Sequence, residues 1–157
     1  ASYWCSQITP ENVAKFDELR DLYLGVSETA QNAVDQQCQK KVTITDLVTN
    51  NDPNGAFDTT SQCTINASST KITCTATVTA NDTIKKDLAS FSSTTVTLQM
   101  SMQTTSSKLT SKGHDLGEVA TVDVDRSGTG KTQFTVPYDP TWGEYYKVDV
   151  KSFFPNE

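Results

Sequence analysis

The chain has 157 residues, of which 35% are hydrophobic and 20% charged, and this length and composition fit one globular domain with a buried core. A net charge of −6 argues against nucleic-acid and anionic-membrane partners, since both require a basic surface, and no apolar run reaches the roughly 20 residues that span a bilayer. About a quarter of the residues are Ser or Thr, whereas there are only one His and four Cys. The chain therefore has few of the side chains that most catalytic mechanisms require.

Residues 1–40 have the pattern of amphipathic helices. Apolar side chains recur at intervals of three and four residues and form one stripe, made up of Val13, Phe16, Leu19, Tyr23 and Val26. Thr9 is a suitable N-cap for this helix, and Pro10 suits its first position. Gly25 interrupts the stripe, and Ser27 is placed to cap a second helix. We therefore expect an N-terminal helical hairpin or helix pair.

Residues 41–157 have mainly the pattern of strands, because apolar residues alternate with polar ones. The runs lie at 42–48, 61–80 with a turn at 67–70, 96–102, 120–124, 134–138 and 146–150. Between residues 82 and 91, the spacing of Ile84, Leu88 and Phe91 predicts a short helix instead.

Strands with one apolar face favour an antiparallel sheet, and the helical stripe needs a surface to cover. The sequence therefore predicts an α+β fold, with the N-terminal helical hairpin or helix pair packed on an antiparallel β-sheet. Two architectures stay open: a curved, cone-like sheet around the helices, or a β-sandwich with the helices appended. We expect a single secreted domain over 1–157, with a helical segment at 1–40 and mainly antiparallel strands at 41–157.

The four cysteines, Cys5, Cys38, Cys63 and Cys74, contain no closely spaced pair of the kind that binds zinc, so we expect disulfides. If the chain turns at 67–70, Cys63 lies opposite Cys74 on one face of a hairpin. A bridge between them leaves Cys5 for Cys38. An unbroken helix would extend about 45 Å and place Cys38 out of reach of Cys5. Either Gly25 forms a hairpin or this second pairing is wrong, and we favour the hairpin.

Two N-x-S/T sequons make Asn66 and Asn81 candidate N-glycosylation sites. The expected hairpin turn places Asn66 near its tip. Sequons arise readily by chance in a chain rich in Ser and Thr, so the disulfides are the stronger indication of compartment. Together they predict a secreted, extracellular glycoprotein.

Three motifs that invite a chemical role are better explained as turns and loops. The segment 123–129 resembles the first half of a calcium loop but lacks the final bidentate acid, so we expect a hairpin turn with positive φ at Gly128 and Gly130. The segment 128–132 lacks the earlier glycine and the following helix of a phosphate loop. No nucleophile can be located for His114, which we expect in an exposed loop. The sequence therefore predicts no enzyme, no metal and no cofactor.

The segment 138–146 concentrates aromatic side chains around a Pro/Gly turn between two strands. Exposed aromatic residues provide large, rigid contact area, so Tyr138, Trp142 and Tyr145 are candidate binding residues. The structural alternative places Tyr138 and Tyr146 in the core and makes Trp142 a lid over the end of the sheet.

We therefore expect a secreted, disulfide-stabilised, non-catalytic recognition protein that binds an extracellular protein or glycan, in the manner of a host-directed factor or surface antigen. The alternative is an extracellular carrier of a small apolar ligand between helices and sheet. Its candidate lining residues are Phe16, Tyr23, Met100 and Met102, although the two methionines are most simply core residues.

Overall fold

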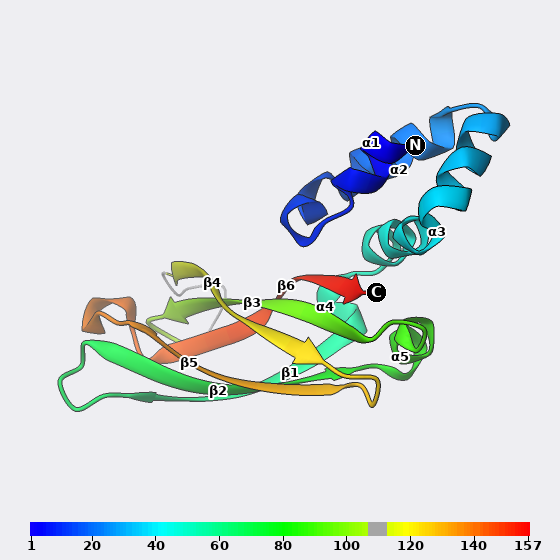
Figure 1. The fold of residues 1–157 in the computed structure, drawn as a ribbon. Coiled ribbons are helices and arrows are strands. Elements are labelled where there is room, and N and C mark those ends of the chain that lie inside the picture. Colours follow the sequence, from blue (N-terminus) through cyan, green and yellow to red (C-terminus); the bar gives the residue numbers. More distant parts are fainter. Residues whose placement is uncertain (107–112) are drawn as a thin grey trace.

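A computed structural model describes residues 1–106 and 113–157 and shows an α+β fold (Figure 1). Helices come first in the chain and are followed by two three-stranded antiparallel sheets. The predicted fold class is confirmed, and of the two open architectures the structure has the sandwich with appended helices.

The helical lobe, residues 1–50, consists of α1 (Ser2–Gln7), the 3-10 helix η1 (Pro10–Lys15), α2 (Phe16–Gly25) and α3 (Glu28–Asn50). Helix α2 ends at Gly25, as predicted. Ser27 caps α3, because its hydroxyl oxygen accepts a hydrogen bond from the Ala30 N–H at 3.2 Å. Helix α3 has a non-helical residue at Cys38, where its axis kinks.

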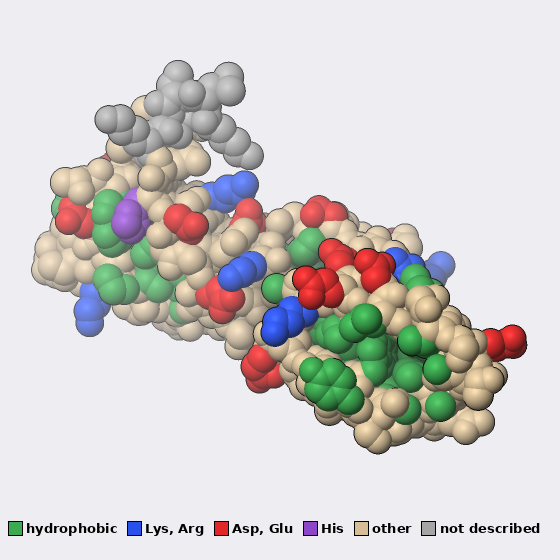
Figure 2. Space-filling view, turned by 90° about the horizontal axis from the view of Figure 1, so that it is seen from above, with side chains coloured by type: hydrophobic (Ala, Val, Ile, Leu, Met, Phe, Trp, Pro, Cys, Tyr) green, Lys and Arg blue, Asp and Glu red, His purple; other side chains and the backbone are tan. Residues whose placement is uncertain are grey.

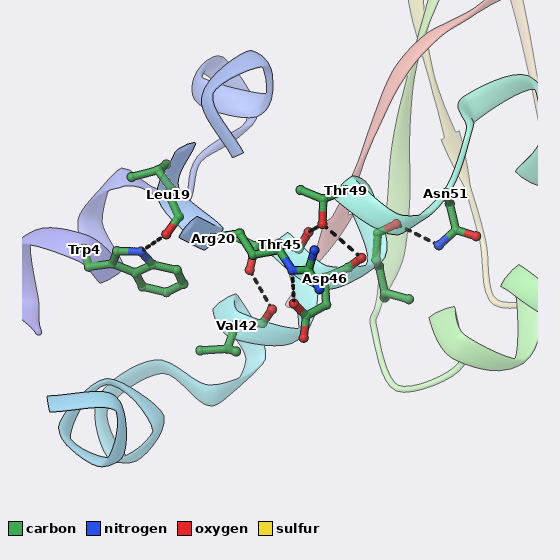
Figure 3. A network of polar contacts seen from close by, with 9 residues as sticks. Trp4, Leu19, Arg20, Val42, Thr45, Asp46, Thr49 and Asn51 are labelled. Carbon is green, nitrogen blue, oxygen red and sulfur yellow. Dashed lines mark hydrogen bonds and ion pairs between the residues drawn. The ribbon is translucent and has the colours of Figure 1, made fainter. Parts of the chain in front are cut away.

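The prediction of a strand at 42–48 is wrong, since α3 continues to Asn50. Ile44 and Val48 are four residues apart, a spacing that fits one helical turn as well as two strand repeats. Thr45 and Thr49 are accommodated because each hydroxyl donates to a carbonyl in the preceding turn, Thr45 to Val42 at 2.7 Å and Thr49 to Thr45 at 2.8 Å (Figure 3). Packing of Ile44 in the core overrides the strand preference of these β-branched residues.

A disulfide, a hydrogen bond and an ion pair hold the helical lobe together, and Figure 3 shows the second and the third. A disulfide joins Cys5 to Cys38, the pairing that the sequence predicts. The buried Trp4 donates its indole N–H to the Leu19 carbonyl at 2.7 Å, which satisfies its polar atom. The Arg20 guanidinium meets the Asp46 carboxylate of α3 at 3.1 Å. These contacts tie α1 and α2 to each other and to α3.

The remaining elements build the sandwich, in this chain order: α4 (Pro53–Ala56), β1 (Phe57–Ile65), β2 (Lys71–Ala80), α5 (Asp82–Leu88), β3 (Ser93–Gln103), β4 (Gly113–Val124), β5 (Thr129–Pro137), the 3-10 helix η2 (Pro140–Trp142) and β6 (Tyr145–Asn156). One sheet has the strand order β1-β2-β5 and the other β4-β3-β6. The short helix predicted at 82–91 is α5, and Asn81 caps it.

The β1–β2 hairpin has the predicted register. Cys63 lies opposite Cys74, and Ile65 opposite Ile72. A disulfide joins the two cysteines, again as predicted. Along β2 the apolar residues are buried and the threonines between them are more exposed, so Ser/Thr richness here reflects the outward face of a sheet.

The two sheets cover each other, and the core between them contains Leu98, Met100 and Met102 of β3, each at most 1% exposed. The helical lobe extends away from the sandwich (Figure 1). It meets the sandwich partly through Phe16, whose ring centroid lies 6.2 Å from that of Phe154 in β6. Among the described residues, no helix combines the length and apolar character needed to cross a membrane.

Candidate functional site

Three rings meet at the end of the sandwich that lies away from α5. Trp142 stacks on His114 of β4, with ring centroids 3.8 Å apart and 3° between the ring planes. Tyr138 meets Trp142 edge to face, at 6.2 Å and 90°. The prediction of His114 in an exposed loop is wrong, because strand pairing extends to the start of β4 and the ring is half-buried. We call these three residues the aromatic cluster.

Hydrogen bonds and one glycine fix the η2 turn beneath this cluster. The Asp139 carboxylate accepts from the Thr141 N–H at 2.9 Å and from its hydroxyl at 2.8 Å. These bonds, aided by the charge of His114, lower the pKa of Asp139 below its ordinary value. Gly143 has a φ of 94°, and a Cβ there would overlap the Gln103 carbonyl. Only glycine fits this position without a shift of the backbone.

The three aromatic residues predicted to bind a partner have different environments. Tyr138 is 7% exposed, and its hydroxyl donates to the Gly143 carbonyl at 2.7 Å. Burial, followed by the charges of Glu144 and Asp139, raises the pKa of Tyr138. Trp142 is half-buried, whereas Tyr145 is 50% exposed. The structure thus brings Tyr138 and Trp142 together and leaves Tyr145 as the ring most open to a ligand.

Next to the aromatic cluster, the outward face of the β4-β3-β6 sheet is hollowed. In the strand register Ser101 lies opposite both Asp115 and Lys147, and Gln103 lies opposite Tyr145. Figure 2 looks onto this face, where charged side chains of both signs are exposed. The depression has a volume of about 340 Å³, and we call it the outer-face hollow. Its lining residues are Gln99, Met100, Ser101, Gly113, His114, Asp115, Lys147 and Asp149.

The outer-face hollow offers hydrogen-bonding groups of every kind. Lys147 lies 3.4 Å from the Asp149 carboxylate, and one Asp115 oxygen accepts from the Gly117 N–H at 2.8 Å. Within 1–106 and 113–157, the side chains of Gln99 and Ser101 have no hydrogen-bond partner. An amide, a hydroxyl, two carboxylates and an ammonium group therefore line one shallow depression.

Sequence reasoning missed the polar residues of the hollow. Polar residues of alternating strands usually face solvent without a specific role. Four residues of the hollow are of this ordinary kind, namely Gln99, Ser101, Lys147 and Asp149. Only the pairing of β3 with β6, strands distant in sequence, brings them together. The alternation of β6 is the one sequence pattern that points to part of the hollow, because it places Lys147 and Asp149 on the same face of the strand as Tyr145.

The candidate lining residues of an apolar carrier lie in separate contacts. Phe16 packs against Phe154, and Tyr23 lies in the helical lobe with its ring centroid 5.6 Å from that of Trp4. Met100 and Met102 are packed inside the sandwich. The structure does not bring these four side chains to one cavity.

The calcium-like segment forms the β4–β5 turn. The Asp125 carboxylate accepts hydrogen bonds from the hydroxyl and the N–H of Ser127, which lower its pKa. Gly128 has the predicted positive φ of 90°, but the same prediction for Gly130 is wrong. Gly130 is required for a different reason, because a Cβ there would overlap the Asp123 carbonyl. Across the described part of the chain, no three His, Cys, Asp or Glu residues are grouped to hold a metal ion.

Comparison with known proteins assigns no family. The chain matches no protein-family model, no curated protein and no solved structure. The observations that bear on its function are therefore the aromatic cluster and the outer-face hollow.

Proposed function

We propose that this protein is a secreted, disulfide-stabilised, non-catalytic recognition protein that binds a glycan in the outer-face hollow. The observation that carries the proposal is the line formed by Tyr145, Lys147 and Asp149 on β6, next to Gln99 and Ser101 on β3. A sugar presents both C–H faces and hydroxyl groups. The exposed ring of Tyr145 provides a surface on which the C–H face of a sugar can stack. The amide, hydroxyl and charged groups provide hydrogen-bond donors and acceptors for the sugar hydroxyls.

The polarity of the hollow favours a glycan over a protein as the ligand. The centre of a protein–protein interface is depleted of charged residues and rich in apolar ones. Asp115, Lys147 and Asp149 instead lie within the concave surface. Tyr145, two residues before Lys147 on β6, is a large ring that is 50% exposed.

The contacts of Ser101 and His114 favour binding over catalysis. A serine nucleophile needs a base within hydrogen-bonding distance. The Ser101 hydroxyl has no such partner among the residues that the structure describes. The one histidine of the chain, His114, packs its ring against Trp142, so the imidazole is held within the aromatic cluster.

Extracellular location is supported by the two disulfides, which persist in oxidising compartments. Asn66 adds support, since it is exposed at the tip of the β1–β2 hairpin within a sequon. No specific observation favours the apolar carrier.

Isothermal titration with a panel of tetrasaccharides built from glucose, xylose, mannose, galactose or N-acetylglucosamine tests the proposal. We expect at least one to bind, and Tyr145→Ala to weaken that binding about tenfold, as loss of a well-packed aromatic contact does. Tyr3→Ala is the matched control, because Tyr3 is a 76% exposed ring on α1 of the helical lobe and does not line the hollow. Equal losses in both variants, or no binding by any tetrasaccharide, would contradict the proposal.

A further inference from the structure

A second depression lies beside α5. Figure 1 shows α5 at the end of the sandwich opposite the one where β4 begins and the aromatic cluster lies. Here α5 lies beside the β4–β5 turn, and the turn is attached to β2 by a hydrogen bond from the Ala80 N–H to the Gly128 carbonyl at 2.8 Å. The depression has a volume of about 400 Å³ and is lined by Asp82, Lys85, Lys86, Ala89 and Arg126. We call it the cationic hollow.

The cationic hollow concentrates positive charge on an acidic protein. The chain has a net charge of −6, yet Lys85, Lys86 and Arg126 share this depression with one carboxylate, that of Asp82. In the parts of the chain that the structure describes, none of these three cations forms an ion pair. Cations at the end of a helix are favoured by its dipole, which accounts for the two lysines of α5 but not for Arg126.

Two of the three cations are held in place. Arg126 donates its Nε–H to the Phe91 carbonyl at 2.9 Å, and its remaining guanidinium N–H groups have no protein partner among the described residues. The aliphatic carbons of Lys85 lie against Gly128, where even an added Cβ would come within 3.2 Å of them. Asp125, the acidic neighbour of Arg126, is occupied within its own turn by Ser127. The positive groups are therefore prepositioned and not neutralised.

We infer that the cationic hollow binds a tetrahedral oxyanion, the sulfate or phosphate ester group of a larger ligand. A guanidinium group can donate two parallel hydrogen bonds to such a group, and two ammonium groups add point charges around its other oxygens. This inference concerns a different surface from the outer-face hollow, so it stands or falls independently of glycan binding there.

The test is an amide NMR titration of the intact, oxidised chain with inorganic sulfate and with inorganic phosphate, at a constant ionic strength of about 0.15 M. We expect saturable shifts at Lys86, Arg126 and Gly128, and only weak, unsaturable shifts with acetate. Tighter binding of one of the two anions identifies the ester as sulfate or phosphate. Unsaturable shifts with both anions, or equal effects of acetate, would overturn the inference.

Variants separate the site from general charge effects. Lys86→Gln and Arg126→Gln should each weaken anion binding about tenfold or more, the loss expected for a hydrogen bond between charged groups. Lys86→Gln is the safer of the two for folding, since the Arg126 bond to Phe91 stays intact. Lys71→Gln removes one positive charge at the far end of β2 and should leave affinity unchanged. An equal loss in Lys71→Gln would show that only net charge matters and would refute the site.

Discussion

His114 and Trp142 lie face to face, with ring centroids 3.8 Å apart and 3° between the ring planes. This contact attaches the η2 turn to the first residues of β4. It also places the aromatic cluster beside the outer-face hollow, since His114 belongs to both. The stack is therefore a structural link between the turn and the proposed binding surface.

Removal of the stack should destabilise this end of the sandwich. We expect His114→Ala to lower the free energy of unfolding by about 1 kcal/mol, the usual range for an aromatic pair. Trp142 should become more exposed, with a red shift of tryptophan fluorescence, while Trp4 stays buried in the helical lobe. Thr121→Ala, an exposed change on the same strand, is the control for urea unfolding. Unchanged fluorescence and stability in His114→Ala would show that the stack contributes nothing.

Gly143 should not tolerate a side chain. Gly143→Ala combines a positive φ of 94° with overlap of the new Cβ and the Gln103 backbone, so we expect a loss of about 2 kcal/mol or more. Gly25→Ala is the matched control, because no atom lies within 4 Å of a Cβ built there and its φ is not positive. Thermal unfolding of both variants measures the difference. A Gly143→Ala protein as stable as Gly25→Ala would disprove the constraint.

Stability should fall in alkali through Tyr23. Its hydroxyl donates to the Asp35 carboxylate at 2.6 Å, and this bond, with burial and the charge of Asp35, raises the pKa of Tyr23 from 10.0 to about 12. The folded state therefore holds this proton more tightly than the unfolded state, and the contribution is fully present below pH 10.0 and is lost as the pH rises toward 12. Urea midpoints from pH 8 to 12 compare wild type with Tyr23→Phe.

The difference in urea midpoint between wild type and Tyr23→Phe isolates the contribution of Tyr23 from that of the lysines, which titrate in the same pH range. It should be constant below pH 10.0 and shrink above it. A difference that does not change with pH would mean that the bond to Asp35 does not alter the ionisation of Tyr23.

The two sequons should differ in occupancy when the chain passes through a eukaryotic secretory pathway. Asn66 is exposed, and its side-chain nitrogen makes no hydrogen bond within the described residues. Asn81 is half-buried, and its side-chain nitrogen donates to the Gly55 carbonyl at 2.6 Å while its oxygen caps α5. We expect the folded, secreted protein to carry a glycan at Asn66 alone. Glycopeptide mass spectrometry that finds full occupancy at Asn81 would contradict this.

Local patterns were sufficient for much of the fold. The alternation around Cys63 and Cys74 predicts the register of β1 with β2 because both strands lie on one hairpin and share a buried face. The break at Gly25 is predicted in a similar way, because the apolar stripe of the first helix stops near this residue and Ser27 is placed to cap a second helix. The spacing of residues 42–48 fits both a helix and a strand, and packing of Ile44 in the core decides for the helix.

The candidate site was only partly predictable. Tyr145 is a sequence-based candidate because the segment 138–146 concentrates aromatic residues around a Pro/Gly turn. No local pattern predicts Ser101 or Lys147, because their proximity depends on pairing between β3 and β6. The same reason explains the error at His114, whose environment is set by Trp142 from another element.

The proposed glycan site is tested most directly by amide NMR mapping with the tetrasaccharide that binds best in the titration panel. Shifts confined to Gln99, Ser101, Asp115, Lys147 and their neighbours, and lost in Tyr145→Ala, are the result that we predict. Shifts centred elsewhere, on the helical lobe or on the β1-β2-β5 sheet, or unaffected by Tyr145→Ala, would contradict recognition of a glycan by the outer-face hollow.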